Sequence, residues 1–276
     1  MPEPATLKVV QCNIMHGGWP YEIRGRRLFM ERAGQVEAFE DNFTRLSYPA
    51  DKPARGDPGT AFAELMHDLS PDVIGMQEVD GQDVDRLRGL LGPDWRNTPP
   101  LEGSGASCIF WNSATVTDSG PEEVAVVQNY VNPQRRTIPL RVLKQACVHT
   151  ASQKRFAAVT GKSWYQGTVQ DRNLRAAHTR DFARRGGLTT VVAIDMSPPG
   201  SPPFRAMAPF VAKGSQPTCP TGIFEGRPRS TPMRTDHVFY FSPLLHGPQA
   251  DGIIRCETGP FFGSDHLYVW ADVELP

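Results

Sequence analysis

The sequence predicts an α/β fold class on three observations. The chain has 276 residues, of which 39% are hydrophobic and 21% charged, and this suits one large α/β domain or two small ones with ample core. Short apolar runs typical of strands alternate along the chain with segments of helical periodicity. The 26 prolines and 25 glycines indicate many loops between these elements.

Strands are predicted wherever a short β-branched or aromatic run stands between turn signals. They cover residues 7–14, 73–79, 106–111, 138–143, 155–162, 189–197 and 267–273, and in residues 234–241 an aspartate leads into a further strand. Apolar residues recur at helical spacing in residues 60–69, 84–91 and 170–184. Residues 198–233 are rich in proline and glycine without periodicity, so we expect one long loop there, of the kind that often forms a lid or sets specificity.

Charge and cysteine usage narrow the function classes. The formal net charge is -1, so no overall basic excess attracts nucleic acid or an anionic membrane, although a local basic groove is compatible with this total. The five cysteines are scattered without C-x-x-C spacing, which favours reduced thiols over a disulfide framework or a zinc site. The N-terminus has no apolar signal region, and no apolar run is long enough to span a bilayer. We therefore expect a cytoplasmic protein without a membrane partner.

Polar side chains stand at the ends of several predicted strands. Asn13 closes the first strand, where its amide can bind a metal-held water or a phosphate oxygen, or close a turn. Glu78 follows an apolar strand, and a buried carboxylate is costly unless it is paired or binds a cation. Glu78 is therefore the best candidate for a Mg²⁺ ligand, with a backbone or arginine partner as the alternative. Asp195 ends another apolar strand in the same way.

A second group of polar residues lies near the C-terminus. Ser264, Asp265 and His266 directly precede a predicted buried strand, and Asp236 leads into another. Taken alone the triplet is also typical of an ordinary turn, but beside the other strand-end residues it indicates an active site. His266 can act as a general acid or base near neutral pH, and Asp265 can ligate a metal or hold a base. The combined pattern predicts a carboxylate-bound divalent cation beside a histidine oriented by an aspartate, which is suited to phosphoryl chemistry.

Four short motifs, in this order, carry a resemblance to a known family. They are residues 9–14 with the following 15–18, residues 71–79, residues 234–239 and residues 264–266. In these motifs the chain resembles the endonuclease/exonuclease/phosphatase superfamily, which has the fold of pancreatic-type deoxyribonuclease, and the resemblance covers nearly the whole chain. It implies a four-layered α/β sandwich, in which two packed mixed β-sheets are flanked by helices, formed by a single domain over residues 1–276.

The resemblance also implies roles for the matching residues. The implied metal ligands are Glu78, Asn13 and Asp265, with Mg²⁺ as the expected cation and Mn²⁺ as the alternative. The implied catalytic residues are Asp195, which would orient the attacking water, and the pair Asp236 and His266. The implied substrate-binding or phosphate-binding residues are Asn13, His16, Lys162 and Ser197.

Two positions depart from the family pattern. Residues 194–197 match its Gly-Asp-x-Asn motif only in Asp195, because Ser197 stands where an asparagine would hold the phosphate. Lys162 stands where the family often has a phosphate-contacting histidine. A lysine can bind phosphate as a point charge, but with an ordinary pKa it is a poor proton donor.

Three functional hypotheses follow. The first is a Mg²⁺-dependent hydrolase of phosphodiester or phosphomonoester bonds, acting on a small phosphorylated molecule in preference to long nucleic acid because the chain is nearly neutral. The second is an enzyme that keeps the fold but performs non-phosphoester chemistry on a biosynthetic metabolite, as the changes at Lys162 and Ser197 suggest. The third, a non-catalytic binding protein, is disfavoured because an inactive site has no reason to keep buried charges.

Overall fold

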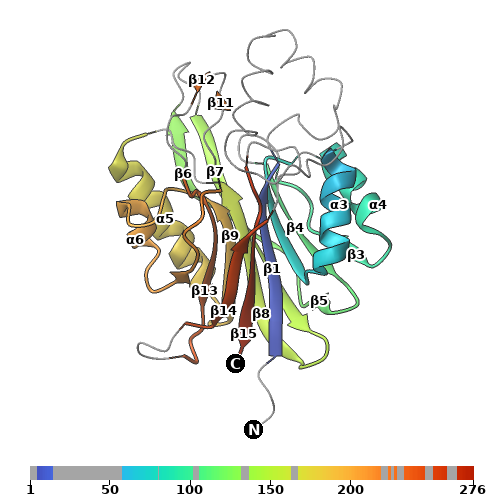
Figure 1. Cartoon of the computed structure of the whole chain (residues 1–276). Coiled ribbons are helices and arrows are strands. Elements are labelled where there is room, and N and C mark those ends of the chain that lie inside the picture. The colour runs from blue at the N-terminus through green and yellow to red at the C-terminus, as the bar shows by residue number, and fades with distance from the viewer. Residues whose placement is uncertain are drawn as a thin grey trace.

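The computed structural model describes residues 5–14, 58–79, 81–101, 106–131, 137–162, 167–218, 223–224, 227–228, 233–245, 251–259 and 266–276. Two mixed β-sheets pack face to face, and helices cover their outer faces (Figure 1). The predicted α/β fold class, with two packed mixed sheets flanked by helices, is confirmed. None of the helices in these ranges has the length and apolar composition needed to cross a bilayer.

The first sheet has six strands in the order β14-β15-β1-β2-β4-β3. Its central strands β1 and β2 run parallel, and its other pairs are antiparallel. The bounds are β1 (Ala5–Asn13), β2 (Val73–Gln77), β3 (Trp95–Asn97), β4 (Ser107–Asn112), β14 (Ile253–Thr258) and β15 (Val269–Leu275). The predicted strands 7–14, 73–79, 106–111 and 267–273 all lie in this sheet.

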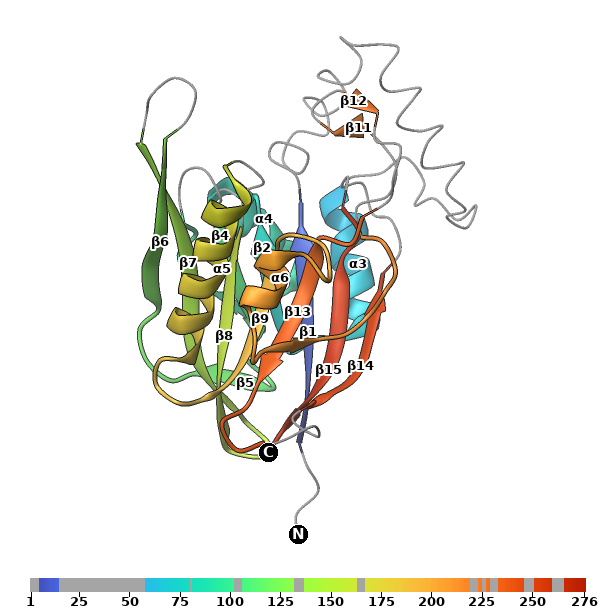
Figure 2. The same cartoon turned by 90° about the vertical axis from the view of Figure 1, so that its left-hand side faces the viewer.

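The second sheet has seven strands, six in the order β10-β13-β9-β8-β7-β5 and β6, which also pairs with β7. Its parallel pair is β8 with β9. The bounds are β5 (Val116–Asp118), β6 (Glu123–Val131), β7 (Thr137–His149), β8 (Lys154–Lys162), β9 (Thr189–Asp195), β10 (Val211–Ala212) and β13 (Asp236–Phe241). Figure 2 shows β6 and β7 at the far edge of this sheet from β13.

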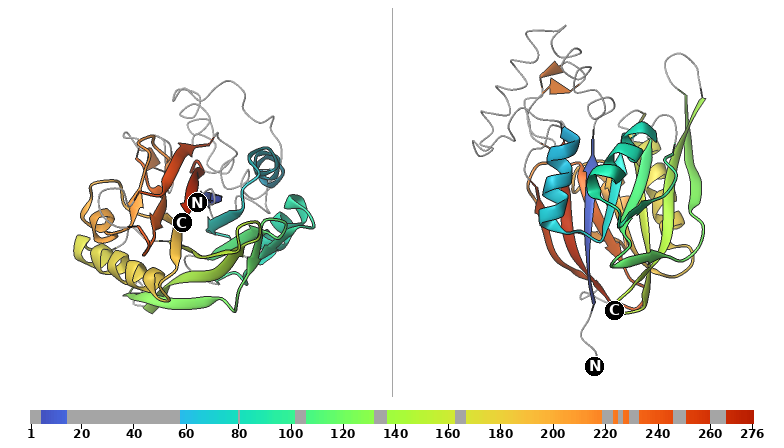
Figure 3. Two further views of the ribbon diagram at one scale, coloured as in Figure 1. Left: turned by 90° about the horizontal axis from the view of Figure 1, so that it is seen from below. Right: turned by 90° about the vertical axis from the view of Figure 1, so that its right-hand side faces the viewer.

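Helices form the two outer layers (Figure 3). On the first sheet lie α3 (Pro58–Leu69) and α4 (Gly81–Leu91), and on the second lie α5 (Val169–Arg184) and α6 (Pro202–Ala206). A capping box at Thr168 and Asp171 fixes the start of α5, because each side chain accepts a hydrogen bond from the backbone N–H of the other. The predicted helices 60–69, 84–91 and 170–184 correspond to α3, α4 and α5.

The strands alternate between two apolar layers, as the period of two requires. Between the sheets lie residues such as Val9, Val73, Ala193 and Val238. Their immediate neighbours face the helices instead: Val10 and Ile74 pack with α3 and α4, while Val192 and Phe239 pack with α6. This alternation decides which strand-end side chains face the space between the sheets.

Residues 198–233 were expected to form one loop, but the described part of this range contains short elements. They are α6, β10, and the two-stranded pair β11 (Ile223–Phe224) and β12 (Arg227–Pro228). Ser201 is the N-cap of α6, because its hydroxyl accepts a hydrogen bond from the Phe204 N–H. Two prolines follow it directly and form the first helical positions. The proline-rich composition that predicted a loop is therefore compatible with a capped first helical turn.

Candidate active site

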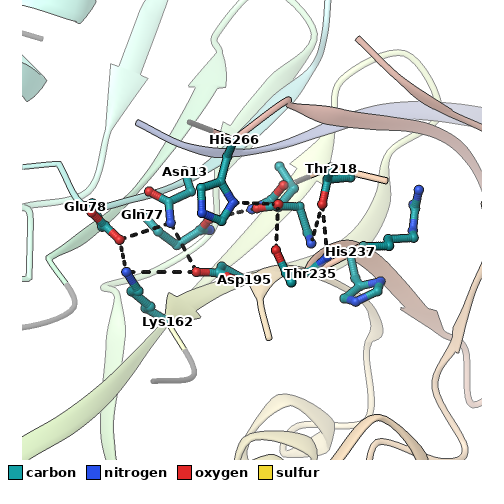
Figure 4. Close-up of polar contacts among 12 residues, drawn as sticks. Asn13, Gln77, Glu78, Lys162, Asp195, Thr218, Thr235, His237 and His266 are labelled. Atoms are coloured by element: carbon teal, nitrogen blue, oxygen red, sulfur yellow. Dashed lines mark hydrogen bonds and ion pairs between the residues drawn. The ribbon is translucent and has the colours of Figure 1, made fainter. Parts of the chain in front are cut away.

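Six polar residues meet at one end of the two sheets (Figure 4). This end is formed by the carboxyl ends of β1, β2, β8 and β9 and by the start of β13. His266, three residues before β15, lies there as well. The residues are Asn13, Glu78, Lys162, Asp195, Asp236 and His266. Because parallel neighbours end at the same edge of a sheet, strands distant in sequence deliver their terminal side chains to one place.

The second sheet contributes a row of three charged residues. Lys162 is paired in register with Asp195 on neighbouring β9, and Asp195 is paired with Asp236 on β13. Residues directly opposite one another on adjacent strands point to the same face. Ala193, two residues before Asp195 on β9, lies in the core between the sheets. Residues two apart in a strand share a face, so Asp195 and the rest of the row face the first sheet.

Glu78 reaches the site through an unusual backbone conformation. The side chain of the preceding Gln77 already faces the second sheet, where its Nε2 donates to Thr160 Oγ1 at 2.7 Å. Strand alternation would therefore turn Glu78 toward the helices. Its φ of 57° breaks the extended conformation and brings both side chains to the same side. A non-glycine residue in this region is strained, and such strain is concentrated at functional sites.

Asn13 connects the two carboxylates that lie on different sheets. Its Nδ2 donates to Glu78 Oε1 and to Asp195 Oδ2, each at 3.1 Å. The ammonium group of Lys162 forms an ion pair with Glu78 Oε1 and lies 4.0 Å from Asp195 Oδ2. The centre of the site is thus two carboxylates, one amide and one ammonium group.

Asp236 and His266 form a hydrogen-bonded pair beside this centre. His266 Nδ1 and Asp236 Oδ2 are 2.7 Å apart, and Thr235 Oγ1 donates to the same carboxylate oxygen at 3.1 Å. Gln11 Nε2 donates to the other oxygen, Oδ1, at 2.7 Å. Burial acts to raise the pKa of Asp236, but the adjacent His266 and hydrogen bonds such as that from Gln11 outweigh it and hold the pKa below 3.8. Asp236 therefore stays ionised and fixes the orientation of the His266 ring.

Asp195 has a different electrostatic environment. Burial raises the pKa of its carboxyl group from 3.8 to about 6, although His266 and Lys162 both act to lower it. Its Oδ1 is buried and accepts no hydrogen bond from the described part of the chain. A carboxylate with a buried oxygen awaiting a donor is suited to hold a water molecule or an ion.

The residues present fit the divalent metal that the resemblance implies. Carboxylate and amide oxygens are the ligands that Mg²⁺ prefers, and Asn13 brings the two carboxylates of Glu78 and Asp195 to one point. A second group of ligand atoms, from Asp195, Asp236 and His266, lies within 4.8 Å. Asp236 and His266 engage one atom of each other, as Lys162 and Asn13 engage Glu78 Oε1, so these contacts do not choose between the two groups. Glu78 and Asn13 are the ligands that the resemblance implies.

Two expected site residues lie outside the described residues. They are His16, expected at the phosphate, and Asp265, expected at the metal. Ser197 is described and buried two residues after Asp195, and its backbone carbonyl lies 3.3 Å from His237 Nε2, within hydrogen-bond distance.

A buried polar network behind the site was not predicted from the sequence. Gln11 Nε2 donates to Gln77 Oε1 at 2.6 Å as well as to Asp236, and Gln77 Nε2 continues to Thr160 Oγ1 and to the Ala193 carbonyl. This chain of side chains connects the strand before Glu78 with the Asp236–His266 pair. In the sequence, Gln11 was the residue that could have indicated this network. It is a polar residue in an apolar strand, and it shares a face with Asn13 two positions later.

Comparisons with known proteins support the architecture. No family model and no curated protein sequence matches the chain. Among solved structures, an endonuclease/exonuclease/phosphatase from Bacteroides vulgatus is similar at 16% identity and a TM-score of 0.67, covering 99% of this chain and 100% of that one. TDP2 from D. rerio, complexed with a single-strand DNA product, has 12% identity and a TM-score of 0.64, with 97% and 98% covered.

A third similar structure is the mannosyl-6-phosphatase Bt3783 of Bacteroides thetaiotaomicron. It has 12% identity and a TM-score of 0.59, and the match covers 96% of this chain and 98% of that one. Such low identities with nearly complete coverage show a shared fold. The chain therefore has the fold of the endonuclease/exonuclease/phosphatase proteins.

Proposed function

We propose that this chain is a divergent member of the endonuclease/exonuclease/phosphatase superfamily that hydrolyses phosphoester bonds with the help of Mg²⁺. The observation that carries the proposal is the meeting of Asn13, Glu78 and Asp195 with the Asp236–His266 pair at one end of the sheets. A structural role does not explain why five strands each place a polar or charged residue in one buried location.

The cation would be held by Glu78 and Asn13, with Asp265 as the further expected ligand. When bound, it supplies positive charge to a phosphoryl oxygen and stabilises the charge that develops there. The protein residues perform the remaining tasks. Asp195 orients the attacking water, because its buried Oδ1 accepts no hydrogen bond from the described residues and can hold that water.

The Asp236–His266 pair manages a proton or steadies the transition state. Because Asp236 lies 2.7 Å from Nδ1, that ring nitrogen carries the proton shared with the carboxylate. The opposite nitrogen, Nε2, is then the atom of His266 that exchanges a proton with the substrate. Gln11 and Thr235 restrain Asp236 and thereby limit rotation of the ring.

We favour a small phosphorylated substrate, with nucleic acid as the alternative. The net charge of -1 gives no general attraction to a polyanion. The similar structures include both a sugar phosphatase and a DNA-bound enzyme, so the fold accommodates both substrate classes. The four described cysteines are free thiols, which supports a cytoplasmic location.

The test is hydrolysis of a panel of phosphodiesters and phosphomonoesters, with and without Mg²⁺. The panel includes sugar phosphates and an abasic-site duplex. We expect Mg²⁺-dependent turnover that falls by at least about a hundredfold in Glu78→Ala and in His266→Ala. Glu64→Ala, on the exposed face of α3, is the matched control and should retain full activity. Equal rates in Glu78→Ala and the unmodified protein would refute the proposal.

The changes at Lys162 and Ser197 favour a second candidate, a repurposed enzyme with non-phosphoester chemistry. Under this alternative the phosphoester panel gives no turnover above the Glu78→Ala background. The double substitution Lys162→His with Ser197→Asn would then restore measurable hydrolysis, because it returns the phosphate contacts of the family pattern. No gain in the double variant would argue against lost phosphate contacts as the cause.

A further inference from the structure

The ammonium group of Lys162 lies against the carboxylate proposed to bind the metal. It forms an ion pair with Glu78 Oε1, and its distance to Asp195 Oδ2 is 4.0 Å. The exposed fraction of the side chain is 17% for Lys162, 11% for Glu78 and 1% for Asp195, so this contact is largely shielded from water. The protein thus supplies its own cation at the centre of the site.

The position of this cation is set by regular structure. Lys162 is the last residue of β8, a strand paired on both sides, and it is in register with Asp195 on β9. The preceding Gly161 packs closely on β7, where an added Cβ would lie 2.7 Å from Val142 Cγ1. The register therefore fixes the backbone of Lys162 beside Asp195, and its flexible four-carbon stem carries the ammonium group to Glu78.

A lysine and a divalent metal cannot both use Glu78 without cost. The carboxylate satisfies the ammonium group, and Mg²⁺ requires closely placed oxygen ligands and its own shell of waters. Two cations against the same partly buried oxygen repel each other strongly, because water screens them poorly. Metal binding at Glu78 is therefore weakened as long as Lys162 stays beside it.

We propose that Lys162 competes with the divalent cation for Glu78, so that it acts as an internal counter-ion that lowers the metal affinity of the site. The inference rests on the proposed metal role of Glu78 and adds a specific function to the residue that departs from the family pattern. Removal of the lysine charge should strengthen metal binding, whereas a residue that merely contacts substrate phosphate should leave the affinity for metal alone unchanged.

The experiment is calorimetric titration of Mn²⁺ into metal-free protein, without substrate. We expect Lys162→Met to bind Mn²⁺ at least about tenfold more tightly than the unmodified protein. Lys162→Arg keeps the positive charge and should bind Mn²⁺ as weakly as the unmodified protein. Lys154→Met is the matched control at the other end of β8, where the ammonium group donates to the Leu275 carbonyl, and its Mn²⁺ affinity should be unchanged.

A Lys162→Met affinity equal to or weaker than that of the unmodified protein overturns the inference. If Lys162→Met shows no gain but Glu78→Ala loses Mn²⁺ binding, the proposed metal site stands and only the competition by Lys162 fails. If no variant binds Mn²⁺, or Glu78→Ala changes nothing, both proposals fail. Thermal unfolding with and without Mn²⁺ provides a second readout, and Lys162→Gln replaces Lys162→Met if the methionine variant does not fold.

Discussion

At the scale of single residues, two neighbours on β13 show how strand alternation assigns opposite electrostatic roles. Asp236 faces the space between the sheets, where hydrogen bonds and His266 keep it charged. His237 faces α6, and its ring centroid lies 5.1 Å from that of Phe204. Burial lowers the pKa of His237 to about 3, and the charge of Arg234 adds to the effect, so this histidine is neutral at physiological pH.

His237 should make the protein sensitive to acid over a defined range. The unfolded chain binds a proton at this residue below about pH 6.5, whereas the folded chain does so only near pH 3. Stability is therefore complete above pH 6.5 and falls with decreasing pH by about 1.4 kcal/mol per pH unit down to about 3. Urea unfolding at several pH values should show this extra slope in the unmodified protein relative to His237→Gln, whose amide can still donate to the Ser197 carbonyl.

Gly89→Ala on α4 provides the control, because it changes no titratable group and should leave the pH dependence of unfolding as it is in the unmodified protein. Parallel pH profiles for His237→Gln and the unmodified protein would show that the folded state accepts the proton without cost. The buried ring among Phe204 and Phe239 would then have to admit water or move on protonation.

At the scale of elements, the site depends on how strand ends are held in place. Thr218, at 0% exposure, lies within the range expected to be a loop, and its Oγ1 accepts hydrogen bonds from the N–H groups of Thr235 and Asp236 at 3.0 Å each. Its own carbonyl accepts from the Leu267 N–H at 2.7 Å. One threonine therefore connects the start of β13, which carries Asp236, to the residue that follows His266.

Replacement of Thr218 by valine keeps the shape of the side chain and removes the shared acceptor. We expect a loss of about 2 kcal/mol in the free energy of unfolding, because two buried N–H groups lose their partner. We also expect a fall in kcat of about tenfold or more, because Asp236 and His266 shift relative to each other. Thr218→Ser keeps the hydroxyl and should preserve kcat, whereas a serine variant as impaired as the valine variant would assign the effect to the lost methyl group.

At the scale of the whole molecule, the sequence predicted the buried elements better than the edge elements. Strands β1, β2, β8 and β9 were predicted close to their bounds because apolar runs of that length mark strands buried on both faces. Strand β6 was not predicted, since its exposed Val124 and Val126 pack against no core that would impose an apolar–polar alternation. An edge strand forms because it pairs with a neighbouring strand, and the local sequence pattern carries no information about that pairing.

The same distinction applies to the site. The strand-end positions of Asn13, Glu78 and Asp195 were predictable, because polar residues after apolar strands are visible in the sequence. The ion pair between Glu78 and Lys162 was not, because it joins two different sheets and depends on their separation and register. The αL conformation of Glu78 has no signal in its residue type either, since glutamate rarely adopts it.

The site therefore depends on the spacing of the two sheets, and Gly75 lies where β2 packs closely against β8 and β9 of the other sheet. A Cβ at Gly75 of β2 would lie 2.5 Å from the Cβ of Ala193 on β9 and 3.1 Å from Thr160 Oγ1 on β8. Asn13, Glu78 and His266 come from one sheet, while their partners come from the other. An added methyl group must push these halves apart.

Gly75→Ala should lower the free energy of unfolding by about 1–3 kcal/mol through overpacking. It should also weaken Mn²⁺ binding and lower kcat at a temperature where the variant is fully folded, because contacts such as the 3.1 Å bond from Asn13 to Asp195 lengthen. Gly89→Ala, in α4, meets no atom within 4 Å and should be neutral or stabilise by up to about 1 kcal/mol. A destabilised Gly75→Ala variant with undiminished Mn²⁺ affinity and kcat would mean that the site residues adjust independently of the sheets that carry them.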